Sequence, residues 1–323
     1  MKLTKSQERR LRKKLKVKAS DEDVFIRIFL DDLKSEIGDR IRRAETVADV
    51  DEIIDSLDQK ELKKHVRALS NKMLINNNKG FSEIINALAD GYKKLDKKKK
   101  DEKKFIKAAK ELVKKEHLTS PIMQIFEKNM MMIKDLPKEA YKALKKAYLT
   151  GSSFRGTEFE KLLYERMGDR AKLIVRTESS KVNSALTEVR SRSLGVNAYV
   201  WSTSGDARVR DTHSILDGVL IFWDKAPKFI HIAKSGKRSE DVHHAGNIYN
   251  CRCIPLPVFS ISDIQFPIKV AEGAVITERY LKKDTYELSA TGIQSYTKVQ
   301  FLKKYGNRFI SSQDELQRLI AEG

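Results

Sequence analysis

The side chains best suited to chemistry lie close together in the second half of the sequence. Residues 199–253, about a sixth of the chain, hold both tryptophans, both cysteines and four of the six histidines. Cys251 and Cys253 are separated by one residue, and a disulfide between them would close a strained ring. We therefore expect free thiols or metal ligands. With His213, His231, His243 and His244 they offer enough ligand types for a tetrahedral zinc site. The spacing differs from the usual Cys-x-x-Cys knuckle, and with two thiols the site would need two histidines from distant positions.

Charged side chains crowd another part of the same stretch. Asp206, Arg208 and Arg210 would point the same way from an extended segment, because side chains alternate along a strand. Such a set suits a buried ion-pair network that fixes a loop, or an anion pocket. His213 follows closely and is a candidate general base or ligand near neutral pH. Because no evident nucleophile accompanies it, we favour a structural network beneath Trp201 over catalysis.

Short strands are predicted around these side chains. Residues 198–201, 219–223 and 251–259 have the apolar and β-branched composition of strands. Pro255 and Pro257 lie in the last of them and favour an edge position or a strand end, because proline cannot donate a ladder hydrogen bond.

Helices are predicted upstream of the strands. Apolar residues recur at helical spacing through residues 21–150, with Thr46 as one helix cap and Asn76–Gly80 as an expected turn that ends a helix. Gly168 is expected to separate a short helix from a long one that ends near Leu194. No convincing alternating strand pattern precedes residue 151. We therefore predict an α+β protein, in which an all-helical basic N-terminal half precedes a small α+β domain with a few short strands.

The positive charge is concentrated in two blocks of the N-terminal half. The 323-residue chain has a net charge of +19, of which residues 1–20 and residues 93–115 each contribute +8. Such blocks attract phosphate polyanions without reading sequence, so we expect non-specific binding of double-stranded DNA. The residues expected to bind DNA are Arg9, Arg10, Arg12, Lys13, Lys14, Lys97, Lys98, Lys99 and Lys100.

Membranes and export are not expected. Neither basic block carries the face of large aromatic residues that would insert into lipid. No run approaches the roughly 18 to 20 apolar residues of a membrane span, and no apolar signal core follows the N-terminal charges. We expect synthesis in a cytosol-like compartment.

Several short motifs occur in a distinctive order. They are Arg176-Thr177-Glu178, Trp201, Asp206-x-Arg208-x-Arg210-x-x-His213, Leu216-Asp217-Gly218 and Asn250-Cys251-Arg252-Cys253. This series resembles the Mu F-like head-morphogenesis domain of tailed-phage minor head proteins, over residues 151–259. The chain departs from that pattern between Pro227 and Asn250, where it carries a polar insert with His231, His243 and His244.

The resemblance implies a minor head protein inside the virion capsid, made in the host cytoplasm. Portal protein is the implied partner, with scaffold or major capsid protein as further candidates. Implied roles are procapsid assembly and DNA packaging or ejection, without enzymatic activity and without a cofactor other than the zinc considered above. The alternative left open is a metal-dependent hydrolase or nuclease acting at His213 with Cys251 and Cys253.

The expected domain organisation has four parts. Residues 1–20 form a basic arm, and residues 21–150 a helical domain that contains a Lys-rich helix over 93–115. Residues 151–259 form the Mu F-like domain, and residues 260–323 a C-terminal extension.

Overall fold

The computed structural model describes residues 19–92, 107, 109–111, 114–149, 154–258, 261, 264–282 and 285–309. They fall into two compact units, each assembled from separate stretches of the chain. The helical unit comprises Val17–Leu74 and Met123–Ser179, and the sheet unit takes in Ile75–Ile122 and Ser180–Gly323. No helix within the described ranges is both long enough and apolar enough to cross a membrane.

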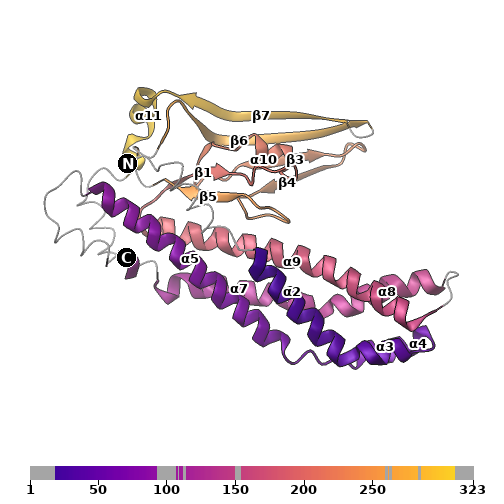
Figure 1. Ribbon diagram of the computed structural model, residues 1–323. Helices are drawn as coiled ribbons and strands as arrows, with labels where there is room; N and C mark the ends of the chain where they lie inside the picture. The colour runs from indigo at the N-terminus through magenta and orange to yellow at the C-terminus, as the bar shows by residue number, and fades with distance from the viewer. Residues whose placement is uncertain are drawn as a thin grey trace. The chain divides into compact units, whose positions relative to one another are not determined.

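The helical unit contains helices and no strand among its described residues. Its elements are α2 (Ala19–Leu33), the π-helical η1 (Lys34–Gly38), α3 (Asp39–Arg43), α4 (Val47–Asp55), the 3-10 helix η2 (Met131–Asp135) and α8 (Leu136–Leu149). Parts of α5 (Leu62–Tyr92), α7 (Glu116–Met130) and α9 (Gly156–Ser193) also belong to it (Figure 1). Thr46 caps α4 as predicted, because its hydroxyl accepts from the Asp49 N–H at 3.2 Å and the Asp49 carboxylate accepts from the Thr46 N–H at 2.8 Å.

The helix end predicted at Asn76–Gly80 is wrong, since α5 runs through these residues. Asparagine favours turns because its side chain competes for backbone hydrogen bonds. Here those side chains have partners on α9 instead. The buried Asn77 amide donates to Asn183 at 2.7 Å, and the Arg190 guanidinium donates to Asn77 and to Asn78.

The helix break predicted at Gly168 is also wrong, because α9 is continuous from residue 156 to residue 193. A glycine inside a helix costs about 1 kcal/mol relative to alanine. The apolar stripe of α9 passes this position without changing face. Its members lie four residues apart and are fully buried: Phe159, Leu163, Met167, Ala171 and Val175. Burial of that stripe outweighs the single unfavourable residue.

The sheet unit is built on seven strands. They are β1 (Ala198–Ser202), β2 (Leu220–Phe222), β3 (Lys228–Ile232), β4 (Arg238–Val242), β5 (Ile254–Pro257), β6 (Ile268–Lys282) and β7 (Thr285–Tyr296). The order is β4-β3-β6-β2-β1-β5, and β7 pairs with β6. β6 is parallel to β2 and β3, and the other pairs are antiparallel. The edge position predicted for the proline-containing strand is confirmed, because β5 ends the order.

Both faces of the sheet are buried around β1 and β2, which follows from the alternation of side chains along these strands, whereas β4 is exposed along its whole length. Tyr199 and Trp201 of β1 pack on one face with Phe229 of β3. Ala198 packs on the other face, which Phe301 of α11 (Lys298–Tyr305) helps to cover. The α+β class is therefore confirmed, with helices throughout the described N-terminal half.

The strands after residue 260 belong to the same sheet as the predicted Mu F-like domain. β6 lies between β3 and β2 in the strand order, so the boundary expected at residue 259 falls inside the sheet. β6 and β7 are also far longer than the short strands expected, and they run side by side as one hairpin (Figure 1). Their register shifts between Ala271 and Val275, where Gly273 interrupts the alternation that would reveal a strand in the sequence.

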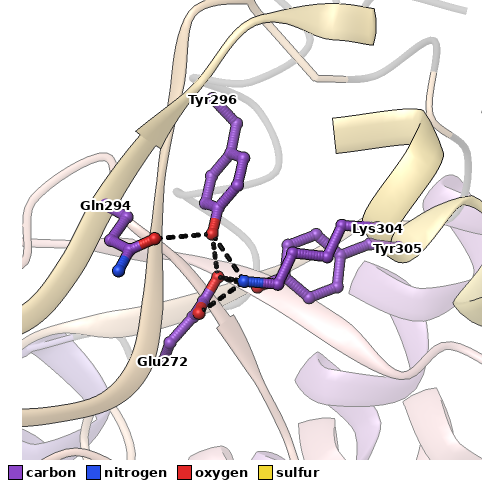
Figure 2. A network of polar contacts seen from close by, with 5 residues as sticks. All are labelled: Glu272, Gln294, Tyr296, Lys304 and Tyr305. Carbon is purple, nitrogen blue, oxygen red and sulfur yellow. Dashed lines mark hydrogen bonds and ion pairs between the residues drawn. The ribbon is translucent and has the colours of Figure 1, made fainter. Parts of the chain in front are cut away.

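A polar network attaches α11 to this hairpin (Figure 2). The Lys304 ammonium lies 2.9 and 2.8 Å from the two carboxylate oxygens of Glu272 and 2.8 Å from the Tyr296 hydroxyl. The hydroxyls of Tyr296 and Tyr305 both donate to Glu272, and Gln294 lies 2.8 Å from the Tyr296 hydroxyl. Burial alone would raise the pKa of Glu272, but the hydrogen bonds from Lys304 and the tyrosines prevail and lower it to about 2.

We expect Glu272→Gln to lower the free energy of unfolding by about 1 to 3 kcal/mol at pH 7. The carboxylate has a lower pKa in the folded chain than its ordinary 4.5, so its contribution is complete above that value and is lost as the pH falls towards about 2. Urea unfolding followed by tryptophan fluorescence measures this, because both tryptophans belong to the sheet unit. Glu287→Gln, at an exposed carboxylate of β7, is the control. If the difference in free energy of unfolding between the two variants were still present in full at pH 2, the lowered pKa of Glu272 would be contradicted.

Candidate functional site

The β1–β2 connection is closed at its base by the Leu216-Asp217-Gly218 motif. The Asp217 carboxylate accepts hydrogen bonds from the Thr203 N–H at 2.8 Å and from the Thr203 hydroxyl at 2.9 Å. The Gly218 N–H donates to the Trp201 carbonyl at 2.9 Å, and Gly218 has a φ of +76°. Asp217 and Gly218 therefore hold both ends of the connection together, so that the residues between them project from the end of β1.

Within this connection the chain turns instead of continuing as a strand. The Val209 N–H donates to the Asp206 carbonyl at 3.0 Å, and the Asp206 carboxylate accepts from the Arg208 N–H at 3.0 Å. A single helical turn, α10 (Asp211–Ser214), follows and carries His213. Because the segment turns, the alternation expected of Asp206, Arg208 and Arg210 does not apply.

The predicted Asp/Arg network that fixes a loop is found, but it lies at the surface and is not buried beneath Trp201. Asp206 is 40% exposed and makes a two-pronged ion pair with Arg252, while Arg208 is 72% exposed. Arg210 donates to the backbone carbonyl of Tyr249 at 2.9 Å. The Arg252 guanidinium lowers the pKa of Asp206 through these hydrogen bonds. The charges thus clamp the β1–β2 connection to the segment before β5 from the solvent side.

The segment before β5 is fixed by backbone geometry and by α9. Asn250 has a φ of +50°, in the left-handed region that asparagine tolerates better than most residues, and this turn leads into Cys251. Gly246 has a φ of +82°, and an added Cβ there would lie 2.9 Å from the Cys253 carbonyl oxygen. The Ser184 hydroxyl of α9 donates to the Ala245 carbonyl at 2.7 Å.

These two segments bring His213, Cys251 and Cys253 into one cluster. The His213 Nδ1 lies 3.6 Å from the Cys251 sulfur and 3.5 Å from the Cys253 sulfur. The Cys253 N–H lies 3.4 Å from the Cys251 sulfur, and all three possible ligand atoms lie within 4.8 Å of one another. The predicted grouping of His213 with both thiols is therefore found in the structure.

The cluster is shielded from solvent and flanked by a second histidine. His213, Cys251 and Cys253 are 3%, 2% and 4% exposed. The Nε2 atoms of His213 and His243 are 3.4 Å apart, and His243 stacks on Phe229 at 4.2 Å between ring centroids. Trp201 lies edge-on to His213 at 5.3 Å.

The protonation states follow from burial and from the thiol pair. Burial lowers the pKa of His243 to about 3, so its ring is neutral near pH 7. Hydrogen bonding from Cys253, and then from His213, lowers the pKa of Cys251. The same bond between the thiols raises the pKa of Cys253, and burial adds to that rise. The interaction between the thiols thus favours ionisation of Cys251 over ionisation of Cys253.

The other predicted site residues lie elsewhere. Arg176 and Glu178 belong to the part of α9 in the helical unit, where the buried Glu178 accepts from Asn129 at 2.8 Å. The residues expected to bind DNA, from Arg9 to Lys14 and from Lys97 to Lys100, lie outside the described residues.

Sequence reasoning named His243 only as one of four histidines that could bind zinc, and it missed two other residues that shape the site. Asp217 was noted only as part of a motif, and Gly246 was not considered. The sequence offers only weak turn signals for Asp217 and Gly246. Asp217 precedes a glycine, and Gly246 follows a pair of histidines in a polar loop.

We expect Gly246→Ala to destabilise the sheet unit much more than Gly236→Ala. Both glycines have similar positive φ values, +82° and +78°, so both substitutions incur the backbone penalty of about 1 to 2 kcal/mol. An added Cβ meets nothing within 4 Å at Gly236, whereas at Gly246 it meets the Cys253 carbonyl and Ser180. The total cost at Gly246 should therefore be roughly twice as large or more. Urea unfolding followed by tryptophan fluorescence compares the two, and equal costs would contradict the close approach.

Comparison with known proteins identifies one family and one relative. The model of the family described as Phage Mu protein F like protein matches residues 138–255. An uncharacterized protein of Haemophilus influenzae is 38% identical over 89 residues, which are 28% of this chain and 17% of that protein. The matched part thus spans about a sixth of the length of that curated relative. No solved structure matches the chain.

The matched residues contain the motifs on which the sequence resemblance was based, from Arg176 to Cys253. The Mu F-like family model indicates phage head morphogenesis, and the family is one of structural proteins. The match over residues 138–255 to the family described as Phage Mu protein F like protein confirms the resemblance that the motifs indicated.

Proposed function

We propose that this chain is a minor head protein of a tailed phage. In this proposal it associates with the portal inside the capsid and acts in head assembly and in DNA packaging or ejection. The observation that carries the proposal is the match of residues 138–255 to a family of head morphogenesis. The fixed, solvent-shielded cluster of His213, Cys251 and Cys253 fits a structural domain, because its members hold two loops together.

Charge placement supports DNA as the partner of the N-terminal blocks. Residues 1–20 and 93–115 together hold +16 of the net charge of +19, so the rest of the chain is nearly neutral. Lysine and arginine at this density neutralise phosphates and release counterions, and this contribution to affinity does not depend on base sequence. A protein that meets packaged DNA of any sequence requires this kind of binding.

The hydrolase alternative has less support. A hydrolytic site needs access for its substrate and a base to activate water. The cluster at His213 is buried, and within the described part of the chain no carboxylate joins it. Asp211 and Asp217, the carboxylates nearest to His213 in sequence, are exposed, and Asp217 accepts hydrogen bonds from Thr203.

The DNA-binding part predicts a particular salt dependence. The logarithm of affinity should fall linearly with the logarithm of salt concentration, with a slope of about −0.9 per phosphate contacted. Deleting residues 1–18 should make that slope shallower, and so should replacing Lys97, Lys98, Lys99 and Lys100 with Gln. Salt titrations on two unrelated duplexes measure both effects, and the two duplexes should give equal affinities. Unchanged slopes in both variants would exclude these blocks as the DNA contacts.

The head-protein part predicts where the chain is found during infection. We expect it in procapsids and in DNA-filled heads purified from cells infected by a phage that encodes it. Quantitative mass spectrometry should show fewer copies of it than of the major capsid protein, which serves as the internal control. Absence from both kinds of particle would contradict the proposal.

A further inference from the structure

The three donor atoms of the His213, Cys251 and Cys253 cluster already have the spacing of a zinc site. Zinc binds thiolate sulfur at about 2.3 Å and imidazole nitrogen at about 2.0 to 2.1 Å, so the tetrahedral angle separates sulfur from nitrogen by about 3.6 Å. The distances from the His213 Nδ1 to the two sulfurs are 3.6 and 3.5 Å. Both agree with the tetrahedral value.

The ligand types select a borderline-soft cation. Two thiols and an imidazole favour zinc over calcium or magnesium, which take oxygen ligands. The cysteines are one residue apart in the chain, and a disulfide between them is disfavoured by ring strain. Both are free and buried, so a bound cation gives these thiols a role that packing alone does not explain.

The surroundings also have the features of a metal site. A metal-binding histidine normally donates its other ring N–H to an acceptor, which fixes the ring orientation. The Nε2 of His213 lies 3.4 Å from the Nε2 of His243, which is such an acceptor in the tautomer that leaves this nitrogen without a proton. Stacking on Phe229 holds His243 in place.

We propose that Cys251, Cys253 and the Nδ1 of His213 bind one Zn²⁺ ion, with a water molecule in the fourth tetrahedral position. The ion joins α10, in the β1–β2 connection, to the residues that lead into β5. The two strands that pair with β1 are β2 and β5. The ion therefore cross-links the loop that leads from β1 to β2 with the loop that leads into β5. The ion ties these two segments together, and the inference does not depend on the proposed head function.

Metal analysis of the untagged full chain tests the proposal directly. We expect about one zinc per chain in the wild-type protein and little in Cys251→Ser, Cys253→Ser or His213→Gln. His231→Gln is the matched control, because His231 lies on β3, contacts Glu278 at 2.9 Å and is not among the clustered ligands. Its zinc content should equal that of the wild type. Folded wild-type protein that contains no metal and takes up no added Zn²⁺ would overturn the proposal.

Measurements on the wild-type chain guard against variants that fail to fold. Removing the metal with a chelator should lower the melting temperature of the sheet unit by on the order of 10 °C, and adding Zn²⁺ back should restore it. X-ray absorption at the zinc edge should show two sulfur ligands and two nitrogen or oxygen ligands. Replacement by Co²⁺ should produce thiolate-to-metal absorption bands. A zinc ion with only oxygen and nitrogen ligands would place it elsewhere and contradict the assignment.

Discussion

The contact of His213 with the two cysteine sulfurs is the interaction on which the loops around β1 depend. It lies in a core where polar groups need partners, because an unpaired buried polar group costs about 1 to 3 kcal/mol. Both segments that supply the cluster are then restricted in their backbone paths. Asn250 adopts a left-handed conformation, Gly246 leaves room for the Cys253 carbonyl, and Asp217 closes the β1–β2 connection. The surface pair of Asp206 with Arg252 reinforces the same junction.

The need to pair buried polar groups also explains the polar side chains of α9 within the sheet unit. Arg190 is fully buried, and desolvation lowers its pKa to about 10. It donates to the side chains of Asn77 and Asn78 and lies over the Phe81 ring at 5.7 Å. Ser184 reaches the loop that precedes the cysteines. This helix therefore positions the site through hydrogen bonds as well as through apolar packing.

The relation between the family match and the fold is also informative. The match ends at residue 255, yet β6 lies between β3 and β2 in the sheet. Strands outside the matched residues therefore complete the sheet that supports the site. The insert between Pro227 and Asn250 supplies β3 and β4, and it also supplies His243, which contacts His213. In this chain the insert is therefore part of the core around the site.

Short-range pattern was sufficient to predict most of the helices, the strands β1, β2 and β5, the edge position of β5 and the grouping of His213 with the cysteines. It did not predict β3 and β4. The features that it did predict depend on propensity, on proline chemistry and on ligand types, all of which can be read locally. The path of α5 through Asn76–Gly80, the place of β6 in the sheet and the partner of Asp206 were decided only in the tertiary structure. Each depends on a group far away in sequence, such as Arg190 for Asn77 or Arg252 for Asp206. At these positions the distant partner satisfies a buried polar group or extends a strand ladder, and this outweighs the local conformational preference. The local sequence pattern does not identify that partner.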